Sequence, residues 1–271
     1  MAAKQIDWRN PFLPLLGGLV LLAWLALSLW AASPYDRYLD HGQWTEGGLA
    51  AALCQALPGG PVGVQALLYI GGWLLMSAAM MLPTATPLIG IFARVTADRP
   101  DRGTLVALLI AGYLLIWGAF GAVAHGMDSA LHALILALPW LGFHGWIIGA
   151  AVLAGAGAFQ FSALKYHCLD RCRTPFSFVN QYWRGSAAHR QAFLLGAHHG
   201  IFCVGCCWAI MLLMFVVGTG NLGWMLALAA VMTIEKNASW GRRLSAPLGY
   251  ALLAGAGVIV VASTLRVAAS V

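Results

Sequence analysis

Charged residues are scarce in this chain. Only 9% of its 271 residues are Asp, Glu, Lys or Arg, while 61% are hydrophobic. The mean hydropathy of +0.80 lies far from that of a soluble globular domain. The sequence also lacks a Gly-x-x-x-x-Gly-Lys-Ser/Thr loop, so nothing in it suggests ATP hydrolysis. This composition predicts an integral membrane protein.

Long apolar runs make up most of the sequence. A membrane-spanning helix needs about 20 mainly apolar residues. The segments between the runs are too short for a soluble domain, so we expect one all-α, polytopic membrane domain over residues 1–271. Seven transmembrane helices, the sixth of them short, are expected near residues 12–31, 66–82, 104–124, 145–164, 192–217, 222–234 and 246–264.

Basic residues predict the orientation of these helices, because Lys and Arg stay preferentially in cytoplasmic loops. With the N-terminus in the cytoplasm, 13 of the 15 Lys and Arg residues fall in cytoplasmic segments, leaving only Arg37 and Arg266 outside. We therefore expect a multi-pass protein of the inner (plasma) membrane, surrounded by the lipid bilayer. The net charge of +6 is spread over membrane-flanking loops, so no nucleic-acid partner is expected.

Histidines and cysteines cluster in the fifth expected helix. Thiols and imidazoles surrounded by lipid have no water to bond with, so such a cluster indicates a functional site. Spacings of three and four residues place most of them along one side of the helix, as a ladder of ligands. Soft metal ions favour these ligands. The residues are His198, His199, Cys203, Cys206 and Cys207.

Methionines of the second expected helix fall at matching depths. With a rise of about 1.5 Å per residue, Met76 lies level with Cys203, and Met80, followed by Met81, lies level with His199. Thioether, thiolate and imidazole at one depth suit Cu⁺ best, and zinc is the less favoured ion. Simple packing also explains methionines at helical spacing.

A further pair of cysteines lies in the loop before the fifth helix. Cys168 and Cys172 are one helical turn apart among basic residues, which favour the thiolate form. Both metal or redox chemistry and a merely basic helix end fit this pattern. Cys206 and Cys207 fall in the outer half of the membrane by the same count of helix rise. They are therefore not expected to share a coordination sphere with the loop pair unless that loop re-enters the membrane.

An outer metal site is a second hypothesis. His125, Asp128 and His132 have the i, i+3, i+7 spacing that places them on one helix face. Two imidazoles and a carboxylate so placed could bind Zn²⁺ or Cu²⁺. The alternative is the polar stripe of an amphipathic helix at the membrane interface.

Two short patterns complete the candidate set. Glu235, beside Lys236, is an acidic residue near the inner end of the core helices, where it could accept a proton or a cation or form a local ion pair. Gly196 and Gly200 have the small-xxx-small spacing that lets a neighbouring helix approach closely.

Four blocks between roughly residues 76 and 255 resemble one protein family. They are Ala79-Met80-Met81-Leu82-Pro83 with Pro87, Gln160-Phe161 with Lys165 and the Cys168/Cys172 run to Pro175, the segment from His199-Gly200 to Trp208, and Glu235-Lys236. The third block is the most specific. The blocks resemble the predicted metal-binding integral membrane proteins of domain-of-unknown-function family 2182. The resemblance implies a polytopic membrane fold and a metal site but no established reaction, and it has no counterpart for His125, Asp128 and His132.

The sequence thus predicts a membrane metal-binding protein, with copper as the expected ion. The protein would hold or move the ion through a Cys/His/Met site between the second and fifth helices. Two alternatives stay open. One is a membrane thiol or copper oxidoreductase. The other is an accessory subunit that delivers metal to a larger membrane enzyme, with a membrane or periplasmic protein as its partner.

Overall fold

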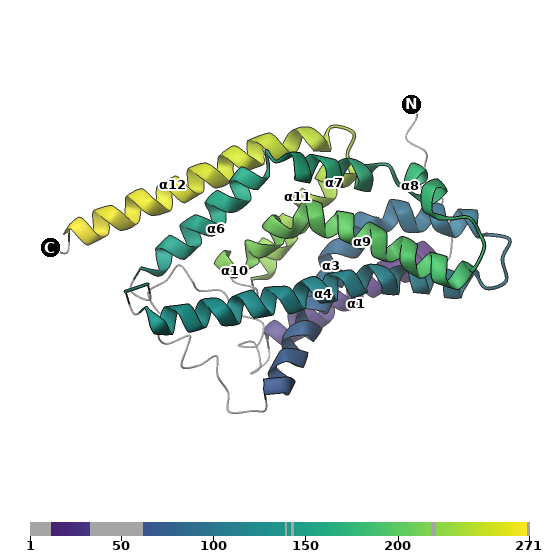
Figure 1. The fold of residues 1–271 in the computed structure, drawn as a ribbon, viewed down its shortest axis with the longest axis horizontal. Coiled ribbons are helices and arrows are strands. Elements are labelled where there is room, and N and C mark those ends of the chain that lie inside the picture. The colour runs from purple at the N-terminus through teal and green to yellow at the C-terminus, as the bar shows by residue number, and fades with distance from the viewer. Residues whose placement is uncertain (1–11, 33–61, 139, 142–143, 218–220, 270–271) are drawn as a thin grey trace.

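The computed structural model describes residues 12–32, 62–138, 140–141, 144–217 and 221–269. Every regular element in these ranges is a helix, as the all-α prediction requires (Figure 1). The elements are α1 (Phe12–Ala31), α3 (Val62–Val95), α4 (Arg102–Ala137), α6 (Gly145–Phe159), α7 (Ala163–Arg173), α8 (Pro175–Tyr182), α9 (Ala188–Leu212), α10 (Met214–Val217), α11 (Leu222–Asn237), the 3-10 helix η2 (Gly241–Leu244) and α12 (Ser245–Ala269).

Five stretches of helix in the described ranges are long and apolar enough to cross a membrane. They lie in α1, α3, α4, α9 with α10, and η2 with α12. A sixth results if α6 and α7, which meet at a bend of 63°, count as one broken span. The helix expected near 222–234 is α11, whose 16 residues do not meet the length of a span. By length and composition the described ranges therefore hold five or six spans, fewer than the seven expected.

Helix α3 continues well beyond its expected end near residue 82. It runs for 34 residues with Pro83 and Pro87 inside it. Hydroxyl groups supply local donors there: Thr84 Oγ1 donates to the Met81 carbonyl at 2.8 Å, and Tyr113 of α4 donates to the same carbonyl at 3.2 Å. A proline leaves the carbonyl four residues earlier without its N–H donor, here those of Ala79 and Pro83, and membrane helices tolerate this where the helix is buried in protein. Likewise α4, expected over 104–124, extends to 36 residues.

Helices α4 and α9 lie side by side and start at the same end of the molecule (Figure 1). A Cβ atom on Gly196 would lie 1.9 Å from the Leu109 carbonyl oxygen, and one on Gly112 would lie 2.1 Å from the Phe193 carbonyl oxygen. Only glycine permits such backbone contact between helices. The close neighbour predicted from Gly196 and Gly200 is therefore confirmed, and it is α4.

Helix α7 turns back against α9 instead of leaving the bundle. Gly205 of α9 makes room for it, because a Cβ atom there would lie 2.6 Å from Cys168 Sγ. Ser162 starts the helix by accepting a hydrogen bond from the backbone N–H of Lys165 at 3.1 Å. Cys168 and Cys172 are consequently buried in the same core as the cysteines of α9.

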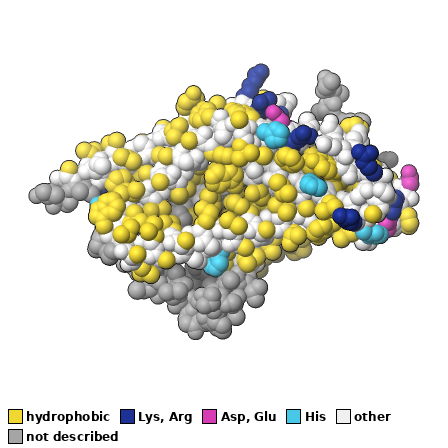
Figure 2. All heavy atoms as spheres, in the orientation of Figure 1, with side chains coloured by type: hydrophobic (Ala, Val, Ile, Leu, Met, Phe, Trp, Pro, Cys, Tyr) yellow, Lys and Arg dark blue, Asp and Glu magenta, His cyan; other side chains and the backbone are white. Residues whose placement is uncertain are grey.

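The outer surface combines wide apolar areas with localised charge. Figure 2 shows hydrophobic side chains over most of one face and Lys and Arg side chains toward its upper and right edges. Large apolar side chains of α1 and α12, such as Leu21 and Val258, are exposed. Large exposed apolar areas mark contact with a membrane or another protein. Two basic residues counted above in cytoplasmic loops, Lys165 and Lys236, are instead buried inside the bundle.

Candidate metal centre

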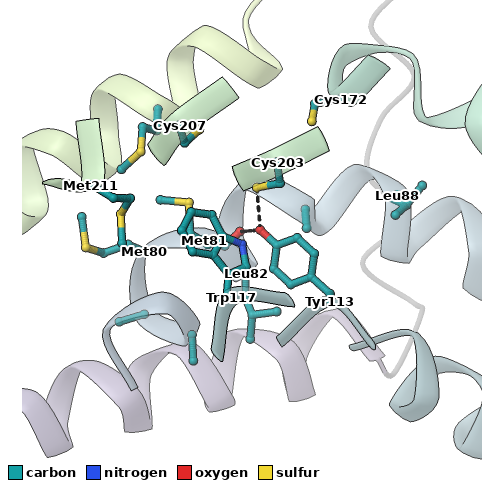
Figure 3. Close-up of a cluster of buried hydrophobic side chains, with 14 of the residues drawn as sticks. Met80, Met81, Leu82, Leu88, Tyr113, Trp117, Cys172, Cys203, Cys207 and Met211 are labelled. Carbon is teal, nitrogen blue, oxygen red and sulfur yellow. Dashed lines mark hydrogen bonds between the residues drawn. The ribbon is translucent and has the colours of Figure 1, made fainter. Parts of the chain in front are cut away.

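Cys203 lies where four helices meet. Its side chain is fully buried on α9, and its sulfur atom lies 2.9 Å from the Tyr113 hydroxyl of α4 (Figure 3). Lys236 Nζ approaches from α11 and donates to Cys203 Sγ at 2.8 Å and to Thr84 Oγ1 of α3 at 3.1 Å. The Cys203 thiol therefore has a hydroxyl group, an ammonium group and the Cys207 thiol as neighbours, inside a mainly apolar core.

Sulfur atoms continue from α9 to α7. Cys206 Sγ lies 3.4 Å from Cys207 Sγ and 4.0 Å from Cys172 Sγ. From the sequence, Cys172 and Cys206 are expected to meet only if the loop that carries Cys172 re-enters the membrane. Helix α7 brings them together by folding back on α9. Cys172 is the most accessible of the three, at 8% exposure against 1% for each of the other two.

Thioether groups surround the same cysteines. Met76, Met80 and Met81 of α3 are buried in one core with Cys203 and Cys207. Figure 3 shows Met80 and Met81 facing the region of α9 that carries Cys203 and Cys207, with Met211 beside them. Met211, which the sequence analysis did not select, follows Cys207 by four residues on α9 and is fully buried. That i+4 spacing is the signal that could have identified it.

The two adjacent histidines have different surroundings. His199 is 3% exposed and stacks on Tyr113 with ring centroids 5.8 Å apart, one helical turn from Cys203. His199 Nδ1 has no hydrogen-bond partner among the described residues. His198 instead stacks on Tyr182 of α8, with centroids 4.8 Å apart. The structure thus places His199 next to the cysteine cluster, whereas His198 lies against α8.

No three His, Cys, Asp or Glu side chains in the described ranges are arranged to hold a metal ion together. The donors near Cys203 and Cys207 include the thioethers of Met80, Met81 and Met211, which lie in the same region of the core (Figure 3). Zn²⁺ is bound by Cys, His and carboxylate side chains, whereas the thioether of methionine is a soft ligand that suits Cu⁺. The donor set therefore fits a soft monovalent ion better than Zn²⁺.

A family model described as PpoB2, copper chaperone, matches residues 70–260. The chain belongs to this family. The match covers all the cysteines of the described ranges and the α3 methionines, and it supports the copper-related reading of the metal-binding resemblance. No curated protein and no solved structure matches the chain.

Next to the sulfur cluster, this PpoB2 family member buries a second polar group. Lys165 Nζ of α7 lies 2.9 Å from both carboxylate oxygens of Glu235, and the two side chains are 0% and 1% exposed. Gln160 accepts from the same ammonium, and Ser245 Oγ donates to Glu235 at 2.7 Å. Glu235 therefore pairs with Lys165, while its neighbour Lys236 turns to Cys203, so the local Glu235–Lys236 pair considered above does not form.

The outer metal site stays a prediction, because the side chains of only two of its three residues are described. The expected outer loop that carries them is the continuation of α4. His125 packs against Tyr69 of α3 with ring centroids 4.5 Å apart and ring planes tilted by 40°, and Asp128 is 8% exposed. The side chain of His132 lies outside the described residues.

Proposed function

We propose that this protein is an integral membrane copper chaperone that holds Cu⁺ at Cys203 and passes it to an acceptor protein. Cys207 and the thioethers of Met80, Met81 and Met211 are the further donors in this proposal, with His199 at its edge. Copper is the cargo of the site. The proposal joins the copper chaperone family to the sulfur-rich core between α3 and α9.

The observation that carries the proposal is the ammonium group beside the thiol. Lys236 is buried, and no carboxylate of the described residues lies within ion-pair distance of its Nζ atom. A buried charge is costly unless it is paired and hydrogen-bonded. Cys203 Sγ, at 2.8 Å, is the group that can supply the opposite charge as a thiolate. Thiolate is also the form of cysteine that binds metal.

The burial of the cluster accounts for ion choice and retention. Met80 and Met81 are 0% exposed, so a bound ion would be shielded from water. Hard ions that keep their water ligands are disfavoured in such a place, whereas Cu⁺ readily takes sulfur ligands. Tyr113 and Lys236 would orient the Cys203 sulfur toward the ion by hydrogen bonds, as outer-shell groups do in metal sites.

The proposal also places the protein in the inner membrane with its N-terminus in the cytoplasm. The apolar spans and the exposed apolar faces of α1 and α12 support insertion in a bilayer, and the basic segments support a cytoplasmic N-terminus in the inner membrane. The acceptor would be a membrane or periplasmic protein. A chaperone is favoured over a transport pathway because the matching family is described as a copper chaperone.

Metal content tests the proposal. The full chain is purified in detergent, loaded with Cu⁺ under reductant and without chelator, desalted, and assayed for metals by elemental analysis. We expect about one or two copper ions per chain in the wild type and a loss of copper in Cys203→Ser. Cys168→Ser is the matched control, because Cys168 is also a buried cysteine but its sulfur packs against Gly205 and it is not one of the proposed donors. Zinc in place of copper, or equal copper in the Cys203 variant, contradicts the proposal.

A further inference from the structure

One pair of cysteines, on α7 and α9, is placed so that it could form a disulfide, a reaction that copper binding alone does not require. Cys172 Sγ and Cys206 Sγ lie 4.0 Å apart and come from different helices. A disulfide needs its sulfur atoms at about 2.05 Å, so the sulfurs must approach by about 2 Å. Cys172 lies in the last turn of α7, whose end at Arg173 is followed by the break at Thr174. A side-chain rotation there can bring the atoms together.

Two other cysteine pairs, both within α9, are less suited to oxidation. Cys206 and Cys207 are neighbours within α9, and adjacent cysteines rarely have the geometry that a disulfide needs. Cys203 and Cys206 have a C-x-x-C spacing, but their thiols serve different neighbours: Cys203 lies against Tyr113 and Lys236, and Cys206 donates to the Cys203 carbonyl at 3.2 Å.

Access also favours this pair. Exposure falls from 8% at Cys172 to 1% at Cys206 and 0% at Cys203. An ion that enters from the α7 side would therefore meet Cys172 first and Cys203 last. Of the two α7 cysteines, which are exposed to a similar extent, Cys172 is the one whose sulfur contacts Cys206.

We propose that Cys172 and Cys206 form a redox-active pair that reduces incoming Cu²⁺ to the Cu⁺ that the Cys203 site retains. Two Cu²⁺ ions each gain one electron, the Cys172 and Cys206 thiols lose two protons and two electrons, and one S–S bond forms between them. The reaction is stoichiometric, with two Cu⁺ formed per reduced chain. This inference rests on the proposed copper function and adds a reductase step to it.

The test adds Cu²⁺ to the reduced, copper-free full chain in detergent, without oxygen or added reductant. Cu⁺ is captured as its coloured bicinchoninate complex, free thiols are titrated, and the bond is located by peptide mass spectrometry. We expect about two Cu⁺ formed and about two thiols lost per wild-type chain, with the bond between Cys172 and Cys206. Cys172→Ser and Cys206→Ser should lose most of this yield, and Cys168→Ser, on the same helix and also buried, should keep it.

Several results would overturn the inference. They are an unchanged Cu⁺ yield in Cys172→Ser, a bond mapped to another pair, or intact thiols in the wild type after Cu²⁺. If the serine variants do not fold, Cys172→Ala and the wild-type bond map decide the question. Loading with ready-made Cu⁺ separates the two proposals: a wild type that binds Cu⁺ but does not reduce Cu²⁺ refutes only the redox step, and one that fails to bind Cu⁺ refutes the proposed function.

Discussion

Lys236 Nζ lies 2.8 Å from Cys203 Sγ, and the two residues come from different helices of the buried core. The ammonium group can therefore stabilise negative charge on the sulfur from a fixed position. Because thiolate is the form of cysteine that binds metal, the proposed copper binding at Cys203 depends on this contact.

Replacing Lys236 with Met should weaken Cu⁺ binding. A hydrogen bond to a charged group contributes about 1.5–3 kcal/mol, which corresponds to about a tenfold to hundredfold loss of affinity. Thr84→Val removes the other acceptor of Lys236 but keeps the ammonium group beside Cys203. The Cu⁺ affinity of this variant should therefore fall by only about fivefold. Competition against a Cu⁺ chelator measures both variants. Equal affinities of Lys236→Met and wild type would contradict this role of the ammonium.

Replacing Glu235 with Gln should destabilise the bundle, because it leaves the buried Lys165 ammonium without its counter-charge. Removing one partner of a buried ion pair costs about 3–5 kcal/mol. Asp170→Asn is the control: its ion pair with Arg242 spans 3.4 Å, both side chains are about half exposed, and such pairs contribute up to about 1 kcal/mol. Unfolding in denaturing detergent gives the difference.

A double variant makes the Glu235 prediction sharper. Adding Lys165→Met to Glu235→Gln removes the unpaired charge and should recover much of the lost free energy of unfolding. A double variant as unstable as Glu235→Gln alone would show that the carboxylate acts through packing or through its bond from Ser245.

Local sequence patterns predicted the parts of this fold that depend on neighbouring residues. Apolar runs gave the helical class, and the Gly196 and Gly200 spacing gave the close contact that α4 fills. Helix ends were less predictable. Pro83 and Pro87 do not end α3, which continues to Val95 with buried residues such as Leu88 following the prolines.

Contacts between distant positions were beyond the sequence patterns. Lys165 and Glu235 are 70 residues apart, and Cys203 and Lys236 are 33 apart, so no helical period relates them. Depth counting also assumed straight helices. The bend of 63° between α6 and α7 returns Cys172 to the core, which a count of residues along a straight span excludes.

Gly196→Ala should disrupt the contact between α4 and α9. The new methyl carbon would lie 1.9 Å from a backbone oxygen of Leu109, which cannot rotate away as a side chain does. Overpacking of this kind costs about 1–3 kcal/mol. Gly90→Ala in α3 is the matched control, since nothing lies within 4 Å of a Cβ atom there. It should be neutral or stabilise the helix by up to about 1 kcal/mol. Thermal unfolding of both variants compares them, and equal stability would argue against a tight interface.

His199→Gln and His198→Gln should differ in copper binding although the two positions adjoin. His199 stacks on Tyr113, whose hydroxyl contacts the Cys203 sulfur, so its loss should perturb the site and lower Cu⁺ affinity about tenfold or more, as changes to outer-shell partners do. His198 stacks on Tyr182 and should leave the affinity unchanged. Chelator competition on the two purified variants measures both values. If both variants lose affinity equally, the histidines act through α9 as a whole; if only His198→Gln does, the ion lies on the α8 side of the helix and the placement at Cys203 is wrong.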